Sequence, residues 1–66
     1  MNYLNVDELF ENYPEINNDF KWKDSDITEF FECKLVNGKM DKGVLLISRK
    51  SFEDLIEFRR QVEKKD

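Results

Sequence analysis

The sequence predicts a small α+β domain with the order helix, loop, helix, β-hairpin, helix. Three observations indicate this class. Apolar residues recur at helical spacing in three segments, two turn signals lie between the second and third of these, and short apolar runs flank the turns. The 66 residues allow one domain, residues 1–66, and a core of this size gives only marginal stability. A homodimer or an obligate partner would supplement that core.

A first helix is expected over about residues 6–13. Asn5 or Asp7 can cap its start, and Pro14 disfavours helical backbone in the residue before it. The apolar positions of the segment fall at i, i+3, i+4 and i+7, which places them on one helix face: Val6, Leu9, Phe10 and Tyr13.

Residues 14–24 contain turn formers and are expected to form a loop. Within this loop, Phe20 and Trp22 alternate with Lys21 and Lys23. The alternation fits either a short edge strand or an ordered loop that places both aromatic rings on the core. Trp22 is accordingly either a core residue or an exposed aromatic anchor for another protein.

A second helix is expected over about residues 26–34, with Asp24 or Ser25 as its N-cap. Cys33 lies near its end and is interpreted as a small hydrophobic residue of the core or its boundary. The apolar face of this helix consists of Ile27, Phe30 and Phe31.

A β-hairpin is expected over about residues 35–47. Leu35-Val36 and Val44–Ile47 would supply its strands. Asn37-Gly38 and Asp41–Gly43 are both turn signals, and either could form the tip.

A last helix is expected over about residues 49–64. Ser48 is a good N-cap, and Ile47 and Phe52 occupy the two positions of a hydrophobic staple. The apolar face predicted for this helix contains Phe52, Leu55, Ile56 and Val62.

Charge is distributed unevenly along the chain. Residues 1–32 contain nine acids and two bases, a balance of −7, whereas residues 33–50 have a balance of +4. A hairpin with lysines near its tip could reach a phosphate backbone, or the same lysines could simply protect strand edges against aggregation. The basic residues of this segment are Lys34, Lys39, Lys42, Arg49 and Lys50.

Three stretches resemble a known family. Residues Leu35–Gly38 and Leu46–Ile56 are similar to the wing and closing helix of small excisionases, which are winged-helix directionality factors of phages and conjugative transposons. Tyr3–Leu9 stands where that family often opens with a "YLTVEE"-like segment. The resemblance implies a winged-helix-like fold and a DNA-binding accessory function in a phage or mobile element, with the basic residues on DNA phosphates.

The second predicted helix departs from that family. In such proteins this helix enters the major groove, where acidic side chains would oppose the phosphates. An alternative function follows, in which the acidic first two helices bind a basic protein partner. The residues assigned to this alternative are Asp24, Asp26, Glu29 and Glu32, together with Trp22.

Several classes of function are excluded by composition. The chain has no His and one Cys, which removes imidazole catalysis, common zinc sites and disulfide frameworks. Val44–Ile47 is its longest apolar run, far short of the roughly 20 residues that span a bilayer, and residues 1–10 lack a signal-peptide pattern. We therefore expect a cytoplasmic, non-enzymatic protein without cofactor, metal, membrane contact or small-molecule substrate.

Overall fold

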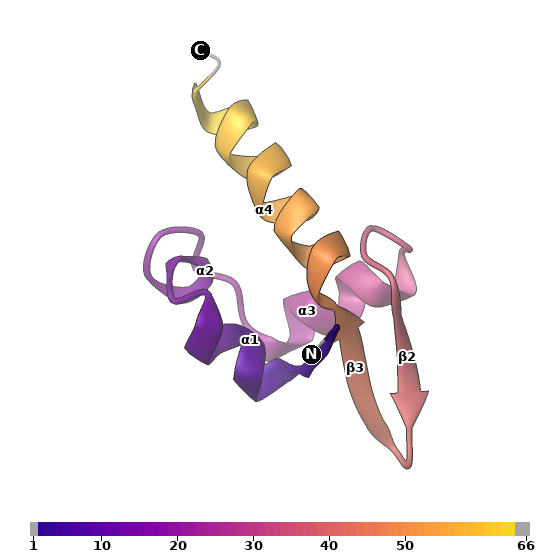
Figure 1. The fold of residues 1–66 in the computed structure, drawn as a ribbon. Coiled ribbons are helices and arrows are strands. Elements are labelled where there is room, and N and C mark those ends of the chain that lie inside the picture. Colours follow the sequence, from indigo (N-terminus) through magenta and orange to yellow (C-terminus); the bar gives the residue numbers. More distant parts are fainter. Residues whose placement is uncertain (1, 65–66) are drawn as a thin grey trace.

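The computed structural model describes residues 2–64 of the protein, and within them seven elements surround one core (Figure 1). The α+β class is confirmed, but the N-terminal strand and the short second helix were not predicted. In chain order the elements are β1 (Tyr3–Asn5), α1 (Val6–Asn12), α2 (Glu15–Asn18), α3 (Asp24–Glu32), β2 (Gly38–Asp41), β3 (Val44–Ser48) and α4 (Arg49–Lys64).

The sheet has three antiparallel strands in the order β1-β3-β2. Leu4 of β1 lies opposite Ile47 of β3, and Gly38 of β2 lies opposite the same residue from the other side. The strand β1 is three residues long, too short to show alternation in the sequence. It forms because the edge of β3 supplies hydrogen-bond partners, and Leu4 is buried there.

The helix α1 begins with a capping box. Asn5 Oδ1 accepts a 2.8 Å hydrogen bond from the Glu8 backbone N–H, and Glu8 Oε1 accepts one of 3.0 Å from the Asn5 N–H. Both bonds satisfy backbone donors that have no partner within the helix. Of the two predicted N-caps, Asn5 and Asp7, the structure has Asn5. The helix ends at Asn12, one residue earlier than predicted, where Pro14 disfavours helical backbone.

The segment predicted as a loop, residues 14–24, contains α2. This one-turn helix buries Ile16 completely, and the Ile16 carbonyl accepts a 2.8 Å hydrogen bond from the Trp22 N–H. The possible edge strand is absent, because Lys21 has a positive φ of 63° and turns the chain. The ordered-loop alternative is the one observed, with Phe20 buried and Trp22 packed against it.

The helix α3 starts and ends two residues earlier than predicted. Its N-cap is Lys23 instead of Asp24 or Ser25, and Asp26 Oδ2 accepts a 2.8 Å hydrogen bond from the Lys23 N–H. At its end, Lys34 adopts a left-handed φ of 64°. Leu35 N–H then bonds the Phe30 carbonyl in a Schellman motif. Cys33 is exposed in this turn, so its predicted place in the core or at its boundary is wrong.

The hairpin is shorter than predicted, with β2 and β3 joined at Lys42-Gly43. Both turn residues have positive φ, 52° and 80°, as a type I′ hairpin turn requires. Asn37-Gly38 is not the tip. Leu35-Val36 is not a strand, because the backbone N–H groups of both residues bond the Phe30 carbonyl at the end of α3, at 2.8 and 3.4 Å.

The helix α4 has the predicted bounds. Ser48 Oγ accepts a 3.4 Å hydrogen bond from the Ser51 N–H, and the staple residues Ile47 and Phe52 are fully buried. Val62 is 48% exposed, so the core-facing stripe of α4 is shorter than predicted. The buried core consists of Leu4, Leu9, Ile16, Phe20, Ile27, Val36, Ile47, Phe52 and Ile56.

Candidate nucleic-acid interface

The hairpin tip places a lysine at the outer end of the sheet. Lys42 is exposed in the turn, and Figure 1 shows the tip extending away from the four helices. Because both turn residues sit in left-handed backbone, the turn is tight and holds Lys42 at the end of a two-stranded ribbon. The charge is therefore presented by a defined backbone and not by a long loop.

Lys39 adds a second cation on the same hairpin. Its Nζ lies 4.5 Å from the centroid of the Tyr3 ring, so strand β1 contributes an aromatic face to a lysine of β2. Such a contact at an exposed site stabilises by about 0.5–1 kcal/mol and orients the ammonium group. Sequence reasoning missed Tyr3, because no local pattern connects it to a strand 36 positions away.

Lys34 and Lys50 lie at the base of the hairpin. Both are exposed, Lys34 in the turn after α3 and Lys50 in the first turn of α4. The Asn37 N–H donates a 2.8 Å hydrogen bond to Ser51 Oγ, which brings the segment after α3 against the start of α4. Four of the five predicted basic residues are thus on the hairpin or beside its base.

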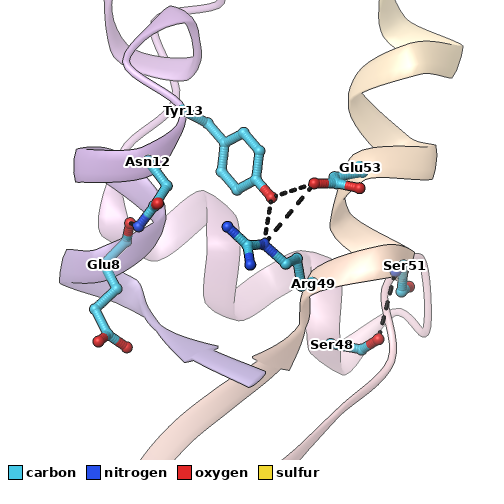
Figure 2. Close-up of polar contacts among 7 residues, drawn as sticks. All are labelled: Glu8, Asn12, Tyr13, Ser48, Arg49, Ser51 and Glu53. Carbon is cyan, nitrogen blue, oxygen red and sulfur yellow. Dashed lines mark hydrogen bonds and ion pairs between the residues drawn. The ribbon is translucent and has the colours of Figure 1, made fainter. Parts of the chain in front are cut away.

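Arg49, the fifth predicted residue, has a different set of contacts. Its Nε lies 3.4 Å from Tyr13 Oη and 3.9 Å from Glu53 Oε2, and the tyrosine hydroxyl donates a 2.7 Å hydrogen bond to that carboxylate (Figure 2). The guanidinium therefore joins α4 to the end of α1. We leave Arg49 out of the candidate interface.

Electrostatics in this cluster reflect burial and hydrogen bonding. Burial raises the pKa of Tyr13; the Arg49 hydrogen bond opposes that rise and the neighbouring Glu53 reinforces it. The hydrogen bond with Tyr13 raises the pKa of Arg49 in turn. Tyr13 is consequently a neutral donor and Arg49 a permanent cation near neutral pH.

The acidic residues of the alternative function are only partly brought together. Asp24, Glu29 and Glu32 are exposed on α3, whereas the Asp26 carboxylate accepts the hydrogen bond from the backbone N–H of Lys23, the N-cap. Trp22 is partly buried, with its ring 4.8 Å from Phe30 and 5.0 Å from Phe20 between centroids. Trp22 and Phe10 also line an open hollow of about 630 Å³ beside the start of α3.

The described residues, 2–64, also bear on two other kinds of site. In that range no group of three or more His, Cys, Asp or Glu side chains is arranged to hold a metal ion. Nor does any helix in the described part of the chain have the length and apolar character to cross a membrane.

Comparisons of the chain with protein-family models, with curated proteins and with solved structures gave no match.

Proposed function

We propose that this protein is a small non-enzymatic DNA-binding accessory or regulatory factor, whose β2–β3 hairpin binds the phosphate backbone. The observation that carries the proposal is the projecting hairpin with Lys42 at its tip and Lys39 held against Tyr3. Lysines on a narrow ribbon can approach phosphates while the acidic helices stay at a distance.

The arrangement of the elements supports a winged-helix interpretation. The hairpin follows α3 and is followed by α4, and β1 pairs with β3 on the far side from β2. In this interpretation the hairpin is the wing and α3 occupies the place of the helix that reads DNA. The proposed excisionase-like role in a phage or mobile element rests on this arrangement together with the sequence resemblance.

We propose that binding is directed to phosphates and not to bases. The exposed side chains of α3 include Asp24, Glu29 and Glu32, and these carboxylates would be repelled by the phosphates that border a groove. Phosphate contacts alone carry little sequence information. We therefore expect weak discrimination between DNA sequences and a strong dependence on salt.

The test is fluorescence anisotropy of a labelled duplex of about 25 base pairs at low and moderate salt. If four lysines neutralise phosphates, the log–log salt slope is about −3 to −4. Substituting Lys34, Lys39, Lys42 and Lys50 by Gln should abolish this dependence and most of the binding. Absence of binding by the wild-type protein at low salt would refute the proposal.

A matched control uses lysines outside the candidate interface. Lys21→Gln and Lys23→Gln remove two exposed charges from the segment before α3. This variant should bind DNA nearly as well as the wild type. The variant is compared with Lys39→Gln combined with Lys42→Gln, which also removes two charges. Equal loss in these two variants would show that net charge, and not the hairpin, determines binding.

A second candidate function is supported by the exposed acids of α3. Asp24, Glu29 and Glu32 could face a basic protein partner, since complementary charge accelerates association and selects partners. Reversing all three to Lys should abolish co-purification of that partner from the cells that naturally contain the protein. Retention of the same partner by the reversed variant would contradict this function.

A further inference from the structure

The outer edge of β2 is open to other molecules. The sheet order β1-β3-β2 leaves β2 paired on one side only, and within residues 2–64 no other strand lies along its second side. Figure 1 shows β2 at one side of the sheet, in the hairpin that extends away from the helices. Lys39, Met40 and Asp41 are all exposed there. An edge strand with free backbone groups is a template for pairing with a strand of another chain.

The hydrogen bonds of the hairpin decide which backbone groups point outward. The Ser48 N–H donates a 2.8 Å hydrogen bond to the Asn37 carbonyl, so that carbonyl points toward β3. In an antiparallel ladder this direction repeats at every second residue. Given the register of the hairpin, the backbone groups of Lys39 and Asp41 also point toward β3. The N–H and C=O of Met40 therefore face the open edge.

An antiparallel pair of β2 strands centred on Met40 joins these outward groups. The two copies of Met40 then exchange N–H···O=C hydrogen bonds, and Lys39 of each copy lies opposite Asp41 of the other. Directly opposite residues have their side chains on the same face of a sheet, so the opposite charges are neighbours. A parallel pair in register would instead place lysine beside lysine and aspartate beside aspartate.

Met40 supplies the apolar part of this contact. It is 60% exposed and lies opposite Leu45, which is only partly buried. Side chains two positions apart share a face, so both residues lie on the face that bears the buried Ile47. Two paired copies would therefore place a row of four apolar side chains, Met40 and Leu45 of each copy, across the joined sheet.

The charges select the register more than they add affinity. Lys39 Nζ lies 4.5 Å from the centroid of the Tyr3 ring, so turning it toward Asp41 of the other copy exchanges one exposed contact for another. A lysine on an edge strand disfavours pairing when another lysine faces it, and in this register like charges do not face each other. The backbone hydrogen bonds and the methionine pair then supply the attraction.

We infer that β2 of a second copy of this chain pairs antiparallel with β2, through a two-fold axis at Met40. The two three-stranded sheets become one continuous sheet. A two-fold interface uses the same patch on both copies, and Lys39–Asp41 is complementary to itself in charge, apolar contact and backbone direction. The wider sheet supplements the small core of a 66-residue chain.

The test is sedimentation velocity of the full chain from about 1 μM to about 1 mM, where the wild type should shift from monomer to dimer. Asp41→Lys places lysine opposite lysine and should raise the dimer dissociation constant about tenfold. Adding Lys39→Asp to this variant restores opposite charges and should return the constant to near the wild-type value. Asp41→Lys also reduces the net negative charge of the chain, so weaker overall repulsion would predict the reverse effect.

The backbone hydrogen bonds are tested by Met40→Pro. Proline removes the outward N–H but none of the hydrogen bonds to β3, so the hairpin should remain while dimerisation is lost. Met40→Ala is the matched control, because it shortens the side chain and keeps the N–H. Far-UV circular dichroism shows whether each variant keeps its fold.

The position of the axis is tested by cysteine cross-linking in a Cys33→Ser background. Met40→Cys should form disulfide-linked dimers, because paired residues at the axis lie within disulfide reach. Val44→Cys is the control, since Val44 is 48% exposed but lies on β3, away from the axis. A wild type that stays monomeric, a charge exchange that does not restore dimerisation, or equal cross-linking through both cysteines would overturn the inference. These readouts contain no DNA, so their outcome is independent of the proposed DNA binding.

Discussion

Tyr13 Oη donates a 2.7 Å hydrogen bond to Glu53 Oε2, which joins the end of α1 to α4 across 40 positions of the chain. The Tyr13 ring lies 5.4 Å from the Phe52 ring between centroids, so the tyrosine combines an apolar contact with a polar one. Arg60 makes a second link of this kind, from α4 to Glu15 of α2. Both contacts join α4 to the N-terminal part of the chain.

Replacing Tyr13 by Phe should weaken the fold modestly. The ring contact with Phe52 remains, but the hydrogen bonds with Glu53 and Arg49 are lost. We expect the free energy of unfolding to fall by about 0.5–1 kcal/mol, the lower part of the usual range because the site is partly exposed. Urea unfolding measures this change. Tyr3→Phe is the control, and an equal loss there would show that the hydroxyl of Tyr13 has no specific role.

The environment of Tyr13 also predicts that the protein loses stability at high pH. Burial raises the pKa of Tyr13 above its ordinary 10.0, so the folded state holds the phenolic proton more tightly than the unfolded state. This contribution is fully present below about pH 10 and is lost as the pH rises through the folded-state value. The stability difference between the wild type and Tyr13→Phe should therefore shrink above about pH 10. Urea titrations at several pH values measure this difference in stability. If it stays constant above about pH 10, the pKa of Tyr13 is not raised in the folded state.

Gly38→Ala should destabilise the sheet. A Cβ at this position would lie 2.5 Å from the Leu46 carbonyl oxygen and 3.2 Å from Phe31 Cδ1, so the strands must move apart. We expect a loss of about 1–3 kcal/mol in thermal or urea unfolding. Gly43→Asn is the comparison, because nothing lies within 4 Å of a Cβ at Gly43 and Asn tolerates its positive φ. Similar losses at both positions would show that the close approach at Gly38 is not the cause.

Much of the helical structure could be predicted from the sequence. The bounds of α4, its Ser48 cap and its Ile47–Phe52 staple depend on residues at most five positions apart. The cap of α1 by Asn5 is equally local. Such features follow from backbone hydrogen bonding within one or two turns, which the sequence encodes directly.

The candidate site was predictable only in part. Its basic residues are visible as charges in the sequence, and the hairpin that bears Lys39 and Lys42 was predicted from its turn signals. Arg49 belongs to the same charged segment, yet its guanidinium lies beside Tyr13, 36 positions away. Local spacing contains no information about such a contact, because it depends on how α1 and α4 pack.

The sequence by itself determined the α+β class, the approximate place of three helices and the hairpin, and the uneven distribution of charge. Tertiary structure decided the rest. Strand β1 exists only because β3 offers an open edge, and the tip is at Lys42-Gly43 because Gly38 is needed opposite Ile47. Whether Val62 faces the core or solvent depends equally on how far α4 extends past the sheet. These outcomes depend on contacts between segments distant in the chain, where packing selects among local preferences of similar free energy.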